Sequence, residues 1–317
     1  MDPTQFFRSS RVTIVAGKGG VGKTTVSAAL ASCAASVGLR TQIVEIEGKS
    51  GLAGLFGRPN LTYDEIELAP MLTARTLTPD DALVEYLADH GLKRISKRLA
   101  ESGALDMVAT ATPGIKDVLI LGKIKQLERA GDHDVIIVDA PAAGHAISFL
   151  RSARGLLDAV KVGPIETQAR EVMELLTDAA RCQVLLVTLP EETPVNELAE
   201  TAFALEDQIG VALAPVVVNG LYPDIEDLSV TPRTAARSAG VRLEPGVGSA
   251  LGEAAAFWTT RRDLQLAQVE RLGAMLPLEQ LHLPFLFEAA IGDGGLERLS
   301  EEIHRGLTAL ADLGTTP

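Results

Sequence analysis

Cysteine is scarce in this sequence, and its scarcity excludes several classes of protein. The 317 residues contain only Cys33 and Cys182. Two cysteines cannot build a disulfide framework, so the sequence favours a reducing compartment. Because both lie in apolar stretches, we expect buried and unreactive thiols. No Cys-x-x-Cys pair occurs, which excludes a zinc site built on that spacing.

Basic residues are also under-represented, because 29 lysines and arginines stand against 42 aspartates and glutamates. The net charge of −13 argues against non-specific binding to nucleic acids or to anionic membrane surfaces, since both require basic patches. No apolar run approaches the roughly 18 residues of a membrane-spanning helix. The start of the chain, Met1 to Arg8, lacks the basic and apolar segments of a secretory signal. We therefore expect a cytoplasmic protein with no nucleic-acid partner.

Glycine is concentrated in one loop that reads Gly-Lys-Gly-Gly-Val-Gly-Lys-Thr-Thr. The loop follows an apolar run, 12–16, and precedes an alanine-rich helical stretch, which is the order that a phosphate-binding loop requires. Lys23 is expected to reach the β- and γ-phosphates of a nucleoside triphosphate, and the Thr24 hydroxyl to bind Mg²⁺. The candidate binding residues of the loop are Gly17, Gly19, Gly20, Val21, Gly22, Lys23, Thr24 and Thr25.

A second acidic signature lies farther along the chain, where a buried apolar strand ends at Asp139. In phosphate-loop enzymes an acid at the carboxyl end of such a strand holds Mg²⁺ or its water ligands. The following small-residue loop contains Gly144, whose backbone N–H we expect to contact the γ-phosphate. His145 is interpreted either as a hydrogen-bonded polar residue or as part of a switch.

Helical and strand-like segments alternate, which predicts an α/β fold: a doubly wound, mainly parallel sheet flanked by helices, as in P-loop NTPases. The expected strands are 12–16, 41–46, 73–77, 134–139, 183–189, 211–219 and 279–283. The expected helices are 23–37, 79–88, 114–130, 166–181, 193–209, 250–274 and 296–310. We predict one domain over residues 1–317, with a helical subdomain at about 79–130. Departures from a minimal sheet are expected at 87–130 and 222–247.

The second lysine of the loop, Lys18, is unusual. The loop resembles the deviant phosphate-binding loop of the ParA, MinD and ArsA ATPases. In those proteins the equivalent lysine crosses a dimer interface and neutralises charge on the partner's nucleotide. The resemblance therefore implies a dimer, with Lys18 acting in catalysis across its interface.

Several further segments resemble the family of ArsA and the tail-anchored-protein-targeting ATPases. They are Asp139–His145 with Phe149-Leu150, Ala111–Asp117, Val184–Glu191 with Glu197, Val216–Asn219 and Leu283–Phe285. The resemblance spans roughly residues 10–310 and is closest to single-domain ArsA-like ATPases of actinobacteria. It implies ATP and Mg²⁺ as cofactors, Asn219 as reader of the adenine amino group, and Pro284 and Phe285 beside the adenine.

The chain departs from this family at the first switch, where Glu47 takes the position of the aspartate that orients the attacking water. Glutamate carries the same charge one methylene farther out, and a displacement of order 1 Å can cost about a hundredfold in rate. Gly48 replaces a proline and loosens the backbone. Lys49 either pairs with Glu47, contacts a phosphate group or is solvated. With Lys18 and Lys23, Glu47 completes the predicted catalytic set.

Two functions remain open. One is a dimeric Mg²⁺-dependent ATPase that couples ATP binding and hydrolysis to dimer opening and closing, for a client protein or a membrane-protein partner. The other is a weakly hydrolysing or non-hydrolysing regulatory subunit in a heterodimer with a paralogous ATPase. The Met-rich insertion, zinc pair and arsenite-binding cysteines of the family are missing. The apolar segment 83–127 is interpreted as core or as a client-binding patch, and the last helix is expected to pack on the sheet.

Overall fold

A computed structural model of the chain describes residues 1–47, 51–89, 114–141 and 143–310. Gly48, Lys49, most of the apolar segment 83–127 and part of the 139–145 segment lie outside the described residues. None of the described helices is both long and apolar enough to span a bilayer.

The described chain forms one sheet of nine strands, in the order β3-β4-β2-β5-β1-β6-β8-β9, with β7 beside β6. The strands are β1 Val12–Gly17, β2 Thr41–Ile46, β3 Ile66–Ala69, β4 Leu72–Leu77, β5 Val135–Asp139, β6 Cys182–Thr188, β7 Ala212–Leu213, β8 Val216–Leu221 and β9 Gln280–Pro284. Only β3 runs antiparallel to its neighbour, and the other described pairs are parallel. The predicted α/β fold with a mainly parallel sheet is confirmed.

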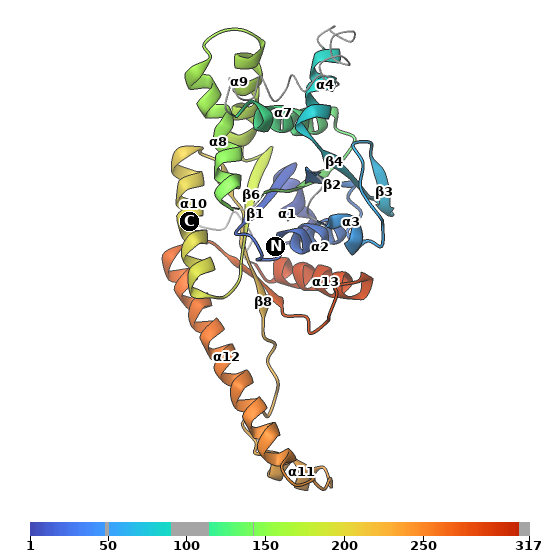
Figure 1. The fold of residues 1–317 in the computed structure, drawn as a ribbon, viewed down its shortest axis with the longest axis vertical. Helices are drawn as coiled ribbons and strands as arrows, with labels where there is room; N and C mark the ends of the chain where they lie inside the picture. Colours follow the sequence, from blue (N-terminus) through green and yellow to red (C-terminus); the bar gives the residue numbers. More distant parts are fainter. Residues whose placement is uncertain (48–50, 90–113, 142, 311–317) are drawn as a thin grey trace.

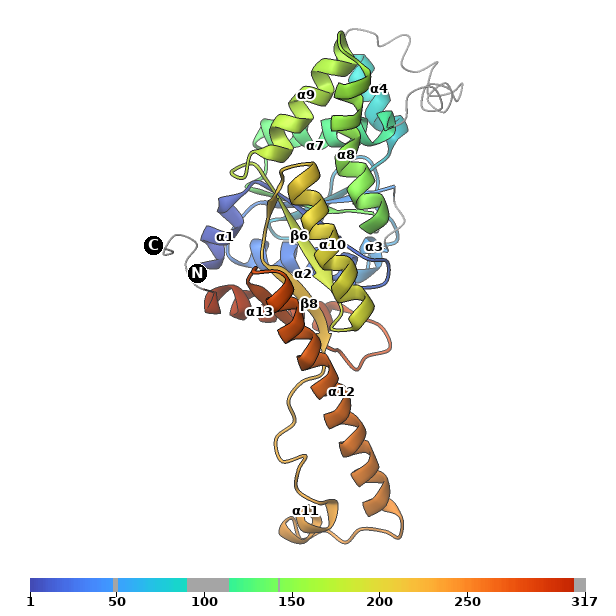
Figure 2. The same ribbon diagram turned by 90° about the vertical axis from the view of Figure 1, so that its left-hand side faces the viewer.

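Helices cover both faces of the sheet (Figures 1 and 2). On one face lie α1 Pro3–Ser9, α2 Lys23–Ser36, α3 Leu52–Leu55 and α13 Asp293–Ala309. On the other lie α4 Pro79–Asp89, α7 Ile115–Ala130, α8 Ala143–Ala159, α9 Pro164–Thr177 and α10 Glu192–Gln208. Adjacent residues of β1 point to opposite faces, so Ile14 packs with the second group and Val15 with the first.

The last helix packs on the sheet as predicted, with Leu299, Ile303 and Leu307 buried. Its C-terminal end is joined to the start of the chain, because the Met1 amino group donates to the Leu310 carbonyl over 2.6 Å. In the described part of the apolar segment 83–127, Val118 is buried in the core, as are its neighbours in the middle of α7. The core interpretation therefore holds for that part.

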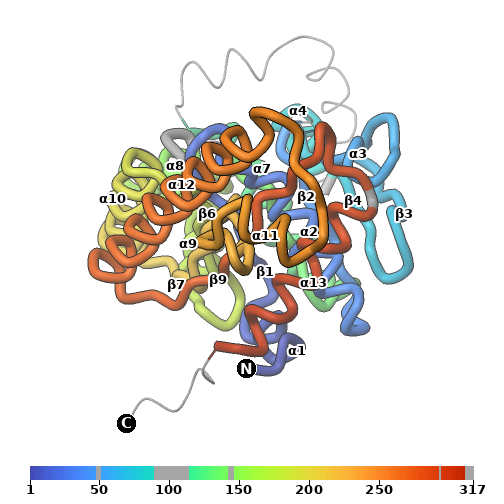
Figure 3. Tube along the Cα trace, turned by 90° about the horizontal axis from the view of Figure 1, so that it is seen from below, coloured from blue at the N-terminus to red at the C-terminus, as the bar shows by residue number. Residues whose placement is uncertain are grey.

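A long arm projects from the body (Figures 1 and 2). The chain leaves the carboxyl end of β8, forms α11 Pro232–Ser238 at the far end, and returns along α12 Val247–Met275. The only buried residues of α12 are Gln265 and Leu272. Figure 3 shows the molecule from below, with the arm toward the viewer. The expected departure from a minimal sheet at 222–247 is therefore confirmed, and it is larger than a loop.

Aromatic side chains join the arm to the body. The rings of Tyr222 and Trp258 lie 4.9 Å apart, and Trp258 stacks on Phe287 with 5.0 Å between centroids. The Trp258 indole donates to the Pro223 carbonyl over 3.2 Å. Gln265 accepts a hydrogen bond from the Tyr222 backbone N–H over 2.8 Å. The arm is thus fixed to the end of β8 at its base.

The sequence pattern missed several elements. The predicted strand 211–219 is two strands, β7 and β8. Helices α1, α3, α8 and α11 were not predicted, and neither was β3. Helix α1 is short and begins after Asp2, whose side chain accepts a hydrogen bond from the Thr4 N–H over 2.8 Å. Strand β3 is an edge strand of four residues, of which one is buried. It is too short to show a period-2 pattern of hydrophobic residues.

Candidate functional site

The glycine loop connects β1 to α2 and is confined by residues of β6 and β8, which lie on one side of β1 in the sheet. A Cβ on Gly17 would lie 2.3 Å from the carbonyl oxygen of Val187 in β6. A Cβ on Gly22 would lie 2.4 Å from Asn219 Nδ2, and Gly22 has φ +89°. Only glycine fits either position, because a side chain would collide and the second backbone conformation is left-handed. Val21, between these glycines, is buried and fixes the loop to the core.

The N-terminus of α2 is open toward the loop. Its N-cap, Gly22, provides no side-chain cap, and no acidic residue lies in the first turn. The first N–H groups of a helix have no intrahelical partners and carry the positive end of the helix dipole. The turn that contains Lys23, Thr24 and Thr25 is therefore suited to binding an anion such as a phosphate group.

Asp139, at the end of β5, is brought to this helix. Thr24 Oγ1 donates to Asp139 Oδ2 over 2.8 Å, and Ser27 Oγ donates to Asp139 Oδ1 over 3.2 Å. The carboxylate is buried, with 4% exposure. Hydroxyl and carboxylate oxygens are the protein ligands that Mg²⁺ prefers, so Thr24 and Asp139 fit the ion that the sequence predicted.

The two lysines of the loop have different surroundings. Lys23 Nζ donates to the carbonyl oxygen of Lys18 over 3.0 Å. Burial lowers the pKa of Lys23, and the Asp139 carboxylate partly opposes that shift. Lys18 Nζ instead lies 2.7 Å from Glu197 Oε1 on α10, with the two side chains 40% and 39% exposed. The structure thus places Lys18 in an ion pair within its own chain.

Glu47 lies just beyond β2 and is exposed. Its backbone N–H donates to the Leu77 carbonyl over 2.9 Å, and its φ is +65°. A left-handed backbone at a non-glycine residue costs of order 1–2 kcal/mol. Two residues earlier, Glu45 is paired in register with Asp139. The strand register therefore places Glu47 at the same edge of the sheet as Asp139.

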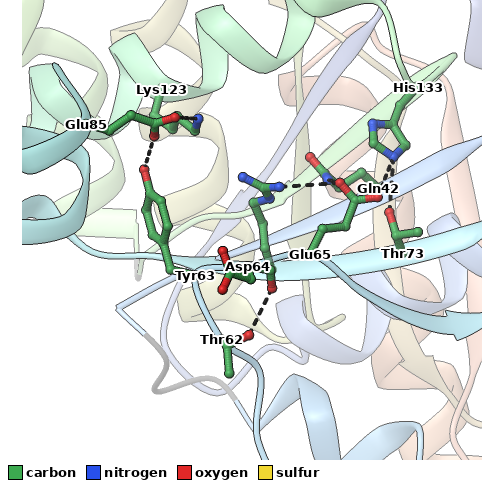
Figure 4. Close-up of polar contacts among 10 residues, drawn as sticks. Gln42, Thr62, Tyr63, Asp64, Glu65, Thr73, Glu85, Lys123 and His133 are labelled. Atoms are coloured by element: carbon green, nitrogen blue, oxygen red, sulfur yellow. Dashed lines mark hydrogen bonds and ion pairs between the residues drawn. The ribbon is translucent and has the colours of Figure 1, made fainter. Parts of the chain in front are cut away.

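The segment that follows the Glu47 loop is held to the helices above it. The Tyr63 hydroxyl donates to Glu85 of α4, and Lys123 of α7 pairs with Glu85 over 2.6 Å (Figure 4). Burial opposes ionisation of Glu85, but hydrogen bonds from Lys123 and Tyr63 outweigh it and lower the pKa of Glu85. Burial and the same carboxylate raise the pKa of Tyr63. The segment around Tyr63, which follows the Glu47 loop, is thus held to α4 and α7 by these contacts.

A second polar cluster holds the same segment to the sheet (Figure 4). Glu65 accepts from Gln42 Nε2 over 2.7 Å and lies 3.0 Å from His133 Nε2. The Thr73 hydroxyl lies 3.1 Å from the same nitrogen, and Arg75 is 3.4 Å from the Glu65 carboxylate. Residues on β2, β4 and the start of β5 therefore converge on one carboxylate before β3.

The predicted adenine-side residues lie on the other flank of the loop. Asn219, on β8, donates from Nδ2 to the Val21 carbonyl over 2.9 Å. Pro284 ends β9, and the Phe285 N–H donates to the Leu221 carbonyl over 2.7 Å. Asn219 thus contacts the loop directly, and the parallel pairing of β8 with β9 brings Phe285 to the same edge. Gly144 lies in the first turn of α8, after Asp139.

Ser27 and Glu197 belong to the site but were not among the predicted site residues. Ser27 lies three residues after Thr24, so helical spacing already places the two hydroxyls on one face of α2. Glu197 matched the family pattern, but nothing in the sequence links it to Lys18 across 179 residues. Cys33 and Cys182 are buried, and burial raises the pKa of each thiol to about 12. The prediction of buried cysteines is therefore confirmed.

Comparison with known proteins supports this interpretation of the site. Residues 10–162 match the family model of the anion-transporting ATPases. ATPase BagA of Mycobacterium tuberculosis (strain ATCC 25618 / H37Rv) is 32% identical to the chain, and the match covers 92% of each protein. The chain belongs to the ArsA family. It is an ATPase, as the phosphate-binding loop predicted.

More distant ArsA-family relatives are larger proteins. An arsenical pump-driving ATPase of Escherichia coli is 27% identical, over 66% of this chain and 39% of the relative. The arsenical pump-driving ATPase of Acidiphilium multivorum (strain DSM 11245 / JCM 8867 / NBRC 100883 / AIU 301) is 26% identical, over 66% of this chain and 39% of the relative. The match to less than half of each relative agrees with the one phosphate-binding loop found here.

Proposed function

We propose that the chain is a dimeric, Mg²⁺-dependent ATPase. In this proposal ATP binding closes the dimer, and hydrolysis reopens it to handle a client protein or a membrane partner. The observation that carries the proposal is the contact between Thr24, at the head of α2, and the buried carboxylate of Asp139. This contact joins the glycine loop to the acidic strand end that phosphate-loop enzymes use together.

Nucleotide binding follows from the groups gathered in the loop. The open N–H groups of the α2 N-terminus and the Lys23 ammonium would bind the phosphates. Thr24 and Asp139 would hold Mg²⁺, which when bound neutralises the charge that develops on the β- and γ-phosphate oxygens. Asn219, already in contact with the loop, would read the adenine amino group with Pro284 and Phe285 beside it.

Lys18 supplies the dimer-dependent part of the proposal. In a single chain its ammonium is held by Glu197 over 2.7 Å. A partly exposed pair of this kind is worth about 0–1 kcal/mol, which a phosphate group can outweigh. We propose that Lys18 leaves Glu197 when two chains close, and that it then neutralises the partner's nucleotide.

Glu47 would orient or deprotonate the attacking water. Its exposure and its position at the sheet edge that carries Asp139 suit this role. Its longer side chain and left-handed backbone make optimal placement harder than for an aspartate, which predicts slow turnover. The same observation favours the second function, a regulatory subunit that binds ATP and depends on a paralogous partner for hydrolysis.

The test is steady-state ATP hydrolysis with Mg²⁺ by the wild type, Lys18→Ala and Glu47→Gln. Lys161→Ala, between α8 and α9, and Glu297→Gln, on α13, remove the same charges from exposed positions and serve as controls. Turnover that rises more than linearly with protein concentration, and is lost in both site variants alone, supports the homodimeric ATPase. ATP binding without turnover supports the regulatory subunit. Absence of ATP binding by the folded wild type contradicts both functions.

A further inference from the structure

The tip of the arm carries a short basic stretch in an acidic chain. Residues 229–252, which lie between Asp227 and Glu253, contain three arginines and one glutamate, a net charge of +2 in a chain of net charge −13. The tip also lies away from the acidic body, because Val247 precedes the anchoring residue Trp258 by roughly 16 Å of helix. The average composition of the chain does not reveal this segregation of charge.

The arginines of the tip surround a cavity of about 900 Å³ between α11 and the start of α12. Arg233 and Arg237 line it from α11, and Arg242 lines it from the segment that joins the two helices. Within the described residues, none of the three guanidinium groups forms an ion pair with a carboxylate. Exposed cations are commonly paired or scattered, so three unpaired guanidinium groups around one cavity indicate a site for an anion.

The start of α12 adds backbone donors to the same cavity. Gly248 and Ser249 line it, and both lie in the first turn of a helix of 29 residues. The N-cap, Gly246, offers no side-chain cap, and the Val247 N–H donates to the Glu244 carbonyl over 3.2 Å. Among the described residues the N–H groups of Gly248 and Ser249 have no such partner and are open to a ligand. Ser249 Oγ donates to Glu253 over 3.2 Å and so does not cap the helix. The dipole of α12 adds positive potential at the point where the guanidinium groups gather.

One acidic side chain, Glu244, also lines the cavity and opposes an anion. Apolar side chains surround the tip: Val230, Val241, Val247 and Leu251 are 38%, 58%, 39% and 48% exposed. Three guanidinium groups around a concave site can each donate two hydrogen bonds to a group with several oxygens, such as a phosphate. The apolar rim is compatible with an acyl chain next to such a group.

We propose that the cavity at the arm tip binds a phosphate group, supplied either by a free phosphorylated molecule or by the headgroup of an anionic lipid. The guanidinium groups of Arg233, Arg237 and Arg242 bind the phosphate oxygens, and the open N–H groups of α12 complete the site. This site is separate from the glycine loop and does not depend on ATP turnover.

The experiment uses the full chain with its nucleotide site saturated by a non-hydrolysable ATP analogue and Mg²⁺, so that the γ-phosphate position of the loop is also filled and added phosphate cannot bind there. Inorganic phosphate and pyrophosphate are titrated by calorimetry. Vesicles of phosphatidylcholine, with and without phosphatidylglycerol, are tested by co-flotation. The cavity variant combines R233Q, R237Q and R242Q. A control variant combines R151Q, R170Q and R305Q, which removes the same charge from exposed helix positions.

The expected result is binding by the wild type and the control variant, and at least about tenfold weaker binding by the cavity variant. E244Q is expected to bind severalfold more tightly, because it removes the opposing charge. Binding of inorganic phosphate or pyrophosphate identifies a free phosphate as the source. Binding of phosphatidylglycerol vesicles alone identifies a lipid headgroup. Either result supports the site.

The proposal is overturned if no phosphate or lipid probe distinguishes the cavity variant from the control variant. It is also overturned if polyglutamate binds the arm while phosphate and phosphatidylglycerol do not, because the surface would then serve an acidic protein partner. All these side chains are exposed, so circular dichroism and thermal unfolding are expected to be unchanged in the variants.

Discussion

Single residues of the loop hold their positions through contacts with other strands. Gly22 leaves room for Asn219, Thr24 donates to Asp139, and Lys23 is partly buried beside the same carboxylate. These contacts bring anion-binding and metal-binding groups together before any ligand arrives. Preformed groups of this kind cost little reorganisation on binding, so their ionisation states determine how binding depends on pH.

Lys23 predicts an alkaline pH dependence of ATP binding. Burial lowers the pKa of Lys23 below the ordinary 10.5 in the ligand-free chain. Phosphate oxygens beside Nζ favour the charged form and raise that pKa again. ATP binding is therefore expected to take up a proton at pH values between the lowered pKa of the free chain and the higher pKa of the ATP-bound chain. Affinity should be independent of this group at lower pH and fall as pH rises through the lowered value.

Calorimetry in buffers of different ionisation enthalpy measures this proton uptake, at pH values above the last ionisation of the triphosphate. Lys23→Arg is the control, because its guanidinium stays charged throughout the range. An alkaline uptake of the same size in Lys23→Arg would assign the effect to another group.

At the scale of elements, the parallel strands bring loops that are distant in the sequence to one edge of the sheet. The turn between α2 and β2 is joined to the start of β5 by one carboxylate. Asp134 accepts the Arg40 backbone N–H over 2.9 Å and two guanidinium contacts at 3.1 and 3.2 Å. This cluster holds the start of β5 beside β2, in the register that pairs Asp139 with Glu45 at the other end of the strands.

Asp134→Asn tests this connection. Hydrogen bonds from the Arg40 side chain and then its backbone lower the pKa of Asp134 below the ordinary 3.8. A lowered carboxyl pKa stabilises the fold above 3.8, and the contribution is lost as pH falls through the folded-state value. Because the pair is partly exposed, the variant should lose about 0.5–1 kcal/mol at neutral pH and almost nothing below the folded-state pKa.

Urea unfolding at neutral and acidic pH measures the difference between this variant and the wild type. Asp263→Asn, at an exposed position of α12, is the control for loss of one negative charge. A deficit for Asp134→Asn that persists unchanged in acid would contradict the ionic origin of the stabilisation.

At the scale of the whole molecule, the described chain has a compact body and one projecting arm, and the proposed dimer concerns the body. Lys18 lies at the surface, where Glu197 holds it against α10. A lysine side chain that must reach across an interface has to break its ion pair within its own chain first. The strength of this pair is therefore part of the free energy of dimer closure.

Glu197→Gln is expected to favour the dimer. Each chain of a homodimer gives up one such partly exposed pair, worth about 0.2–1 kcal/mol, so the variant should lower the dimer dissociation constant by up to about thirtyfold in the presence of a non-hydrolysable ATP analogue. Sedimentation velocity over a range of protein concentrations measures this constant. Glu200→Gln, on the same helix and exposed, is the control. Tightening that persists when Lys18 is also replaced by alanine would show that Lys18 is not responsible.

Local sequence was sufficient for the motif and for most of the sheet. The run from Val12 through Thr25 is contiguous, so strand, loop and helix could be predicted from neighbouring residues, and the strand 41–46 was predicted with its observed bounds. Asp139 was predictable because a buried strand and its last residue are also local. The short edge strand β3 was missed, because its four residues depend on pairing with β4.

The sequence by itself determined a phosphate-binding loop, a strand-terminal acid and a mainly parallel sheet, because each depends on residues that are close in the chain. Only the tertiary structure decided that Lys18 pairs with Glu197, that Asn219 contacts the loop, and that three arginines surround a cavity at the arm tip. Such contacts arise when the backbone brings distant side chains together. Composition averages charge over the whole chain, whereas folding separates a basic tip from an acidic body.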